Sequence, residues 1–328
     1  CRKKGDLEAK EEILLDGNEV AEGHDYMAIA MVTTSPDHSV LAWSVDYAGS
    51  ERYELRFENL TGGQSWSESI PDTEYSGAWA SDNRTYFYTV VNEANRPYKV
   101  MRHVLGTDPR EDVEVLAEDD DAYYIGVWRS RSGAYIMASI ESAVTDEVHY
   151  VDDTNPTDAP KRVAQRQQGV QYGVEHQGER FLILTNEEAL NFKLMEAPVS
   201  APGREHWKEM IPHSEEVTLQ AVHAFKDHLV IYEREGGLTQ LRVRRLADDA
   251  EHRIAVEATS YNLSPGRNAE FDTTNFRYEL VSMTTPQSVF DYDMEAKTAE
   301  LKKQKPVNDY NKKNYEEDRI WATAGDGT

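Results

Sequence analysis

The stretch "GGQSWSES" at residues 62–69, where serines lie beside glycines, comes closest to a hydrolase nucleophile. A nucleophile elbow reads Gly-x-Ser-x-Gly, because glycines permit the sharp strand-to-helix turn that exposes the serine. The stretch lacks the closing glycine, and this pentapeptide occurs nowhere in the chain. Gly-x-Gly-x-x-Gly, the Walker loop and His-Glu-x-x-His are absent too. We therefore interpret 62–69 as a plain turn and assign no catalytic residue.

Metal binding is the second chemistry that the residue types raise. The ten histidines are dispersed along the chain, without the spacing of a ligand set. The acidic runs "EDDD" (118–121) and "DDTNPTD" (152–158) offer oxygen ligands. The second run, however, lacks the glycine and the terminal glutamate of an EF-hand loop. We expect both runs to be solvated connections, and we assign no metal and no cofactor.

The charge of the chain limits its partners. A formal net charge of -25 argues against nucleic acid, which needs a basic surface that releases counterions. A cationic partner or substrate fits better, although surplus carboxylates also serve solubility alone.

Targeting features are scarce in this sequence. No run approaches the roughly 18 apolar residues of a membrane helix, so we expect no membrane contact. The single cysteine, Cys1, excludes internal disulfides, and the N-terminus lacks the apolar core of a signal peptide. The chain begins without Met, and we take it to be a segment of a longer protein or a processed product. We expect a cytoplasmic protein, with the periplasm left open because the true N-terminus is absent.

A repeat organises the whole chain. Turn-forming pairs recur every 45 to 50 residues, at Pro36-Asp37, Asp82-Asn83, Ser132-Gly133, Gln177-Gly178, Lys226-Asp227 and Asp272-Thr273. Four strand-like runs accompany each period. In the second full unit these are "GAWA" (77–80), "TYFYTVV" (85–91), "YKVMRH" (98–103) and "VEVLA" (113–117). The turn in "RHVLGTDPRED" (102–112) therefore joins the third and fourth strands of that unit.

Four strands per unit, apolar on the inside and charged on the outside, are typical of a β-propeller blade. Six units are visible, and "EEILLDG" (11–17) resembles the fourth strand of an earlier one. We therefore predict an all-β, seven-bladed β-propeller of four-stranded antiparallel blades, with the first blade incomplete. The propeller domain would cover 1–305, with the six further blades starting near residues 28, 77, 125, 171, 219 and 261. The open strand edge of the partial blade predicts partial self-association.

Several phrases resemble a known family. They include "MRHVLGTDP" (101–109), "TSPDHSVLAWSVDYAGSERYELRF" (34–57), "NFKLMEAPV" (191–199), "HWKEMIPH" (206–213) and "VSMTTPQSVFDYDM" (281–294). Together they are similar to the propeller domain of oligopeptidase B, within the prolyl oligopeptidase family of serine peptidases. The similarity covers almost the whole chain in order.

The resemblance implies a propeller that caps an α/β-hydrolase domain bearing a Ser-Asp-His triad. Such enzymes cut short peptides after Lys or Arg, and the propeller excludes folded proteins. Residues 306–328 resemble the linker and first strand leading to that hydrolase domain, which is absent here, so the triad would lie beyond Thr328. The partners implied are the chain's own C-terminal hydrolase domain and short basic peptides.

Two residues are candidates for the contact between these domains. In the family, charged residues near segments similar to "GSERYELRF" (49–57) contact the hydrolase, which points to Glu51 and Arg52. The charge types match imperfectly, and a cross-strand surface pair is the alternative for these two residues.

Two other functions stay open on the sequence alone. One is a stand-alone propeller scaffold that binds a protein or peptide on one face, because fold alone does not decide function. The other is a glycan hydrolase with paired carboxylates contributed by any two blades.

Overall fold

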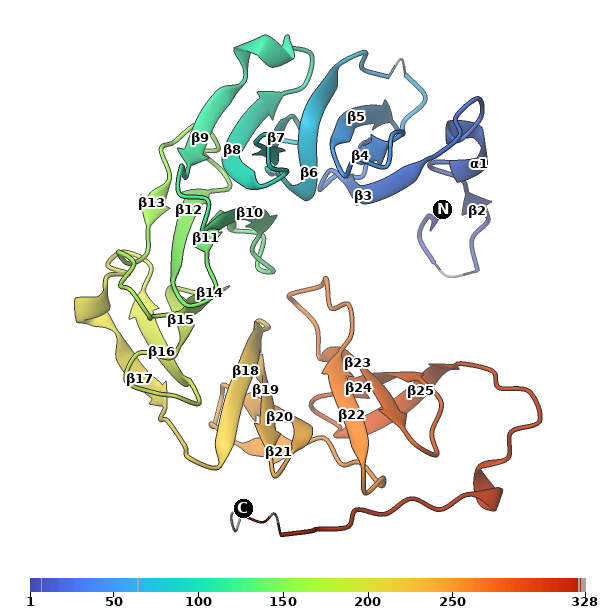
Figure 1. Cartoon of the computed structure of the whole chain (residues 1–328), viewed down its shortest axis with the longest axis vertical. Helices are drawn as coiled ribbons and strands as arrows, with labels where there is room; N and C mark the ends of the chain where they lie inside the picture. The colour runs from blue at the N-terminus through green and yellow to red at the C-terminus, as the bar shows by residue number, and fades with distance from the viewer. Residues whose placement is uncertain (7, 64, 324, 326–328) are drawn as a thin grey trace. The chain divides into compact units, whose positions relative to one another are not determined.

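The computed structural model describes residues 1–6, 8–63, 65–323 and 325, and nearly all of its regular structure is β. The chain divides into two compact units, Cys1–Val170 (unit 1) and Gln171–Thr328 (unit 2), coloured blue to green and yellow to red in Figure 1. Within the described residues, no helix has the length and apolar character needed to cross a membrane.

Unit 1 holds a seven-stranded and a four-stranded antiparallel sheet. The larger sheet follows chain order through β3 (Ala28–Thr34), β4 (Val40–Asp46), β5 (Tyr53–Asn59), β6 (Ser69–Trp79), β7 (Thr85–Val91), β8 (Pro97–Val104) and β9 (Val113–Ala117). The smaller one contains β10 (Tyr124–Arg129), β11 (Tyr135–Glu141), β12 (Asp146–Asp152) and β13 (Lys161–Arg162). A hairpin of β1 (Arg2–Lys3) and β2 (Glu11–Glu12), the short helix α1 (Gly17–Val20) and the 3-10 turn η1 (Pro109–Glu111) complete the unit.

Unit 2 holds three four-stranded antiparallel sheets. These are β14 (Tyr172–Gln177), β15 (Arg180–Thr185), β16 (Lys193–Pro198) and β17 (Lys208–Ile211); β18 (Val217–Ala224), β19 (His228–Glu235), β20 (Leu238–Arg245) and β21 (Glu251–Arg253); and β22 (Tyr261–Pro265), β23 (Asn275–Ser282), β24 (Ser288–Asp293) and β25 (Thr298–Gln304). Two 3-10 turns, η2 (Arg204–His206) and η3 (Lys312–Asn314), lie outside the sheets. The all-β antiparallel fold is confirmed, whereas the count of seven blades stays a prediction.

Strand β4 shows why these sequences form buried strands. Its side chains alternate between two cores, with Val40 and Ala42 on one face and Leu41, Trp43 and Val45 on the other. A period of two places successive side chains on opposite faces of a sheet. Because both faces are covered, the strand reads as a continuous apolar run, as expected of an inner strand.

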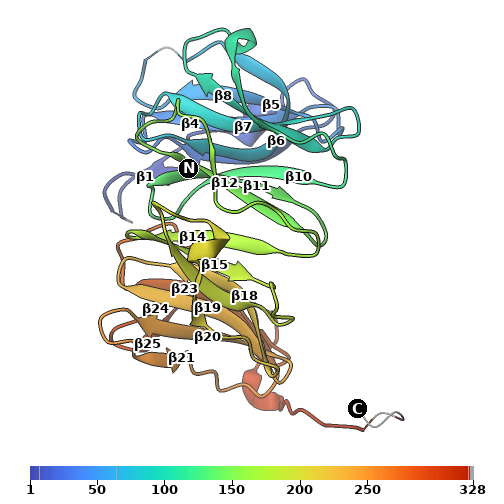
Figure 2. The ribbon, with the colours of Figure 1, turned by 90° about the vertical axis from the view of Figure 1, so that its left-hand side faces the viewer.

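The sheets of each unit pack face to face, as the side view in Figure 2 shows. In unit 2, Leu194 of β16 and Leu229 of β19 belong to one buried cluster. Val230 of β19 shares the next cluster with Phe276 of β23. Apolar burial of this kind contributes about 25 cal/mol per Å², which makes these interfaces the main source of stability.

Each of the six turn-forming pairs identified in the sequence connects the first and second strands of its four-stranded repeat, as predicted. Asn83 and Gly133 adopt positive φ angles of 59° and 72°. The Asp82 carboxylate accepts the backbone N–H groups of Arg84 and Thr85 at 3.0 and 2.8 Å. Asn tolerates this left-handed region better than most residues, and Gly adopts it freely, which explains why such pairs recur at these positions.

Strand β6 is longer than predicted and belongs to two of the four-stranded repeats that the sequence analysis treated as separate. The sequence indicates an inner strand at 77–80 only, but β6 runs from Ser69 to Trp79 and pairs with both β5 and β7. Asp72 within β6 adopts a φ angle of 56°, and register shifts interrupt both pairings where the strand passes from one repeat to the next. A single strand therefore joins the first two complete repeats into one sheet within unit 1.

The distinctive "RHVLGTDPRED" stretch forms the predicted connection between β8 and β9. His103 is fully buried, and its Nδ1 lies 2.8 Å from Asp112 Oδ1. Asp112 Oδ2 accepts the Tyr88 hydroxyl at 2.8 Å. The Asp108 side chain caps η1 by accepting the Arg110 N–H at 3.0 Å. Tyr88, His103 and Asp112 thus form a buried polar network, and Asp108 caps a turn at the surface, so the stretch serves the structure of unit 1.

Candidate functional site

In each four-stranded repeat, the second strand connects to the third at one end of the sheet. We call this end the turn end. In unit 1 the turn ends carry residues 47–52, 92–96 and 142–145. In unit 2 they carry residues 186–192, 236–237 and 283–287. Both candidate interface residues, Glu51 and Arg52, lie on the first of these turns.

Arg52 links two neighbouring turn ends of unit 1. Its Nη1 lies 2.8 Å from Asp72 Oδ1, and its Nη2 donates to the Asn92 carbonyl. Asn95 Nδ2 makes the return link by donating to the Ser50 carbonyl at 2.9 Å. The pair with Asp72 is the kind of cross-strand surface contact that the sequence left as the alternative for Arg52. Partial exposure limits its worth to about 1 kcal/mol or less.

Glu51 is held in place by its own backbone. Its φ angle is 59°, and its N–H donates to Asp46 Oδ2 at 2.8 Å. Asp46 Oδ1 also accepts the N–H groups of Ala48 and Gly49, at 2.7 and 3.1 Å. Burial opposes the charge of Asp46, but these backbone hydrogen bonds prevail and leave its pKa below the usual value. The turn therefore projects the Glu51 side chain into solvent.

Tyrosines and carboxylates surround Glu51 at this end of unit 1. Burial, followed by the charges of Asp46 and Glu51, raises the pKa of Tyr53. The charge of Glu74 raises the pKa of Tyr75, with smaller contributions from burial and Glu51. Burial also raises the pKa of Glu74 itself. Such a surface combines negative potential with aromatic faces, and both attract basic groups.

Apolar side chains gather at the turn ends without cover. In unit 2, Leu190 on the β15–β16 turn is 89% exposed, and Met283 on the β23–β24 turn is 86% exposed. In unit 1, Tyr26, Tyr75, Tyr124 and Val144 are the exposed large apolar or aromatic side chains at these ends. Large apolar side chains concentrated at one end of a sheet mark an interaction surface.

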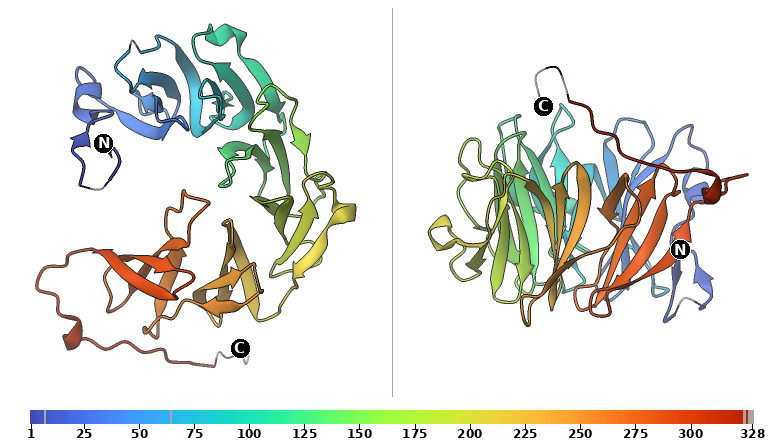
Figure 3. Two further views of the ribbon diagram at one scale, coloured as in Figure 1. Left: turned by 180° about the vertical axis from the view of Figure 1, so that it is seen from behind. Right: turned by 90° about the horizontal axis from the view of Figure 1, so that it is seen from below.

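The segment after β25 adds to this apolar character. It runs along the turn ends of unit 2, as Figure 3 shows in dark red. Ile320 and Trp321 on this segment are 93% and 80% exposed. Within residues 306–323 the only regular element is the turn η3, and no strand forms. Residues 324 and 326–328 lie outside the described residues. The strand predicted within 306–328 stays a prediction, because it would pair inside a following domain.

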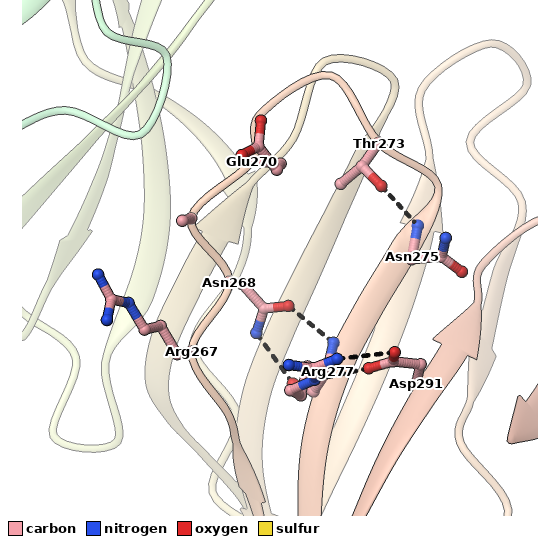
Figure 4. Close-up of a pocket in the computed structure, with 8 residues that line it drawn as sticks. Arg267, Asn268, Glu270, Thr273, Asn275, Arg277 and Asp291 are labelled. Carbon is pink, nitrogen blue, oxygen red and sulfur yellow. Dashed lines mark hydrogen bonds and ion pairs between the residues drawn. The ribbon is translucent and has the colours of Figure 1, made fainter. Parts of the chain in front are cut away.

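The opposite end of the β22–β25 sheet carries a polar hollow of about 340 Å³, between β22 and β23 (Figure 4). Arg277 on β23 grips Asp291 on β24, with Nε–Oδ1 and Nη2–Oδ2 distances of 2.7 and 2.8 Å. These bonds raise the pKa of Arg277 and lower that of Asp291. Asn268 holds the Arg277 backbone through bonds of 2.9 and 2.7 Å. The polar groups of Asn268, Arg277 and Asp291 satisfy one another, and we assign the hollow no ligand.

Two of the three serines in the stretch 62–69, Ser65 and Ser69, pair with glutamates. Ser65 donates to Glu58 Oε2 at 2.6 Å and accepts the Asn59 N–H at 3.0 Å. Ser69 donates to Glu54. Gln64, within the same stretch, lies outside the described residues. A nucleophilic serine needs a base that can take its proton and is itself oriented, usually a histidine, and these contacts do not supply one.

The part of the chain that the structure describes contains no group of three or more His, Cys, Asp or Glu side chains that could hold a metal ion. The acidic runs instead hold parts of unit 1 together. Glu118 lies 2.6 Å from Arg166 Nη1, and Asp153 lies 2.8 Å from Arg129 Nη2.

Sequence reasoning placed Glu51 and Arg52 but missed the exposed apolar residues. A signal for them was present, since Leu190 and Met283 interrupt otherwise polar turns, in "NEEALN" (186–191) and "SMTTP" (282–286). Turns are usually polar, so an apolar side chain there calls for a partner surface.

Comparison with known proteins adds a second line of evidence. Residues 1–305 match the family model described as the prolyl oligopeptidase N-terminal β-propeller domain. The chain is 34% identical over 323 residues to dipeptidyl aminopeptidase BI of Pseudoxanthomonas mexicana, covering 97% of this chain and 44% of that protein.

Two solved structures show the same similarity. Oligopeptidase B from Leishmania major superposes with a TM-score of 0.91 at 28% identity, over 100% of this chain and 47% of that one. Oligopeptidase B from Trypanosoma brucei, with covalently bound antipain in a closed form, gives 0.89 at 30% identity, again over 100% and 47%. The chain spans less than half the length of these relatives.

Proposed function

Because the chain belongs to the prolyl oligopeptidase family, as its N-terminal β-propeller domain, we propose that it is the non-catalytic gate of a serine endopeptidase resembling oligopeptidase B. The full-length form would hydrolyse short peptides after Lys or Arg, with its Ser-Asp-His triad beyond Thr328. The propeller would exclude folded proteins by size. We further propose a cytoplasmic location for this enzyme.

The proposed propeller has seven blades, the first of them partial. The four-stranded sheets that begin at Tyr124, Tyr172, Val217 and Tyr261 each supply one blade. The seven-stranded sheet supplies two, with β6 shared between them. The β1–β2 hairpin supplies the outer strands of the first blade.

The observation that carries this proposal is the exposed apolar surface at the turn ends. A domain that works alone leaves few such side chains uncovered, whereas a domain that docks on a partner presents them. The segment after β25 also leaves unit 2 at this end. We propose that the turn ends face an α/β-hydrolase domain, with Glu51 and Arg52 as interface residues.

The negative charge of the chain would serve the same function. A net charge of -25 concentrates basic peptides near the gate. At an ionic strength of 0.1 M, salt largely screens that attraction at separations beyond about 10 Å. We expect kcat/KM for Lys and Arg peptides to fall with added salt, and an unchanged kcat/KM would contradict the steering.

The size of the natural gene product tests the proposal directly. An antibody against this segment should detect a protein about twice its length, since the chain covers 44% and 47% of two relatives. That protein should cleave short peptides after Lys or Arg, and the 328-residue chain should cleave none. A gene product no longer than this chain would refute the proposal and favour the stand-alone scaffold, whose partner would occupy the same turn ends.

A further inference from the structure

The segment after β25 is tied to unit 2 along its length, although it has almost no regular structure. Tyr310 donates its hydroxyl to the Thr284 carbonyl. Lys312 Nζ lies 3.1 Å from Thr285 Oγ1. The rings of Tyr310 and Tyr315 stack with their centroids 5.5 Å apart. These contacts hold the first half of the segment on the β23–β24 turn, and we call residues 306–321 the strap.

Glu317 anchors the second half of the strap. Its Oε2 accepts the Thr284 N–H at 3.0 Å, and its carbonyl accepts the Thr259 hydroxyl at 3.1 Å. Two residues further on, Arg319 Nη2 donates to the Gly236 carbonyl at 2.6 Å. The strap thus contacts the β23–β24 turn, the β19–β20 turn and the residues that lead into β22.

Thr284 is the receptor on the turn side. It is 94% buried, with 6% of its surface exposed, and the strap engages its backbone on both sides. Glu317 and the Ser282 hydroxyl accept its N–H, at 3.0 and 3.2 Å, and Tyr310 donates to its carbonyl. Buried backbone groups need partners, so detaching the strap would remove the Tyr310 hydroxyl that donates to the Thr284 carbonyl.

The strap also positions an exposed apolar end, at Ile320 and Trp321. Arg319 holds its guanidinium 4.8 Å from the centre of the Trp321 ring. Because Arg319 is bonded to Gly236, this contact keeps Trp321 beside the turn ends of unit 2. The exposed Ile320 precedes it.

We propose that the strap is a releasable latch, closed by the bond between Glu317 and Thr284, that sets the position of the chain leaving the propeller. This inference rests on the proposed function for its consequence: a closed latch would hold a following catalytic domain against the turn ends. An open latch would let that domain move away and admit a peptide. The contacts are few and largely at the surface, so opening is a local event that leaves the sheets folded.

Hydrogen exchange on the 328-residue chain tests the latch itself. The variants are Glu317→Ala, which removes the acceptor, and Glu317→Gln, which keeps an acceptor without the charge. Glu316→Ala is the matched control, because Glu316 is an exposed neighbour that makes no hydrogen bond or ion pair among the described residues. We expect Glu317→Ala to speed exchange at the Thr284 amide and across residues 310–319 about tenfold, the effect of losing one or two hydrogen bonds. Glu317→Gln should lie between, and the control should match the natural chain.

Trypsin gives an independent readout, since Lys312, Lys313 and Arg319 are cleavage sites on the strap. Glu317→Ala should be cut there sooner than the control, while β22–β25 stay protected. The latch would be overturned if the strap amides of the natural chain exchanged as fast as those of an unfolded peptide. Equal exchange and cleavage rates in Glu317→Ala and Glu316→Ala would overturn it too.

The consequence is tested separately in the longer gene product. Glu317→Ala should raise the kcat/KM ratio of longer over shorter basic peptides, because an open gate admits larger substrates. An unchanged ratio would overturn the gating role of the latch. A gene product without peptidase activity would instead overturn the proposed function, and the exchange result would still stand or fall by itself.

Discussion

Glu233 offers the sharpest test of how unit 2 is held together. The residue lies on β19 and is completely buried, with two arginines gripping its carboxylate. Arg242 Nε and Nη2 lie 3.0 and 2.9 Å from Oε2. Arg253 Nε and Nη2 lie 3.0 and 2.8 Å from Oε1. Replacing Glu233 by alanine removes the only fully buried charge of this triad and leaves Arg242 and Arg253 with their more exposed partners, Glu251 and Glu235.

The expected loss of stability depends on how deeply Glu233 and its two arginine partners are buried. Removing one partner of a buried ion pair costs about 3–5 kcal/mol, because the remaining charge stays desolvated. The Arg242 and Arg253 side chains are 20% and 40% exposed, so water screens part of the remaining repulsion. We therefore expect Glu233→Ala to lower the free energy of unfolding by about 3 kcal/mol. For a cooperative unit of this size, that is a fall in Tm of about 6–12 °C.

Thermal and urea unfolding of the natural chain and three variants would measure it. Glu233→Gln keeps the volume and one acceptor, and should fall between the natural chain and Glu233→Ala. Glu235→Ala removes an exposed partner of Arg253 and should cost about 1 kcal/mol or less. A loss below about 1 kcal/mol for Glu233→Ala, or equal losses for the two alanine variants, would refute the reasoning.

Three further predictions concern unit 1. Gly77→Ala should destabilise the chain by about 1–3 kcal/mol, because its Cβ would meet the buried Tyr86 hydroxyl oxygen at 2.1 Å; Gly126→Ala, whose Cβ would meet Ser139 Oγ at 3.5 Å, is the control, and equal Tm values for the two would contradict this. The pKa of Asp46 is lowered in the folded state, so its contribution is complete above the ordinary aspartate pKa and is lost as the pH falls through the lower folded value. Asp46→Asn should therefore show a weaker loss of Tm on acidification from about pH 5 to about pH 2 than the natural chain, and parallel curves would count against it. The open strand edge of the partial first blade, to which we assign the β1–β2 hairpin, should cause concentration-dependent association in sedimentation velocity, and a single monomeric species at every concentration would argue against it.

Local physics explains why much of the fold could be predicted. Turn residues such as Asn83 and Gly133 act through their own backbone preferences, which depend on few neighbours. The alternation in β4 reflects two covered faces, and a continuous apolar run records that condition in the sequence itself. The spacing of the turns also predicted the length of each repeat, which is enough for four short strands.

The candidate surface was predictable only in part. The sequence singled out Glu51 and Arg52 as candidate interface residues, but the partners of Arg52 come from β6, at Asp72, and from the β7–β8 turn, at Asn92. Whether an apolar residue such as Met283 is covered depends on what packs over it, and no local pattern records that.

The sequence by itself determined an all-β chain, its repeat, its connecting turns and a family resemblance, because each depends on residues close together in the chain. The tertiary structure alone decided that Glu233 lies between Arg242 and Arg253, and that Glu317 closes on Thr284. Such pairs join residues whose separation along the chain says nothing about their distance in space. They form only after the sheets have packed, when burial has removed the water that each charge and hydrogen-bonding group would otherwise keep.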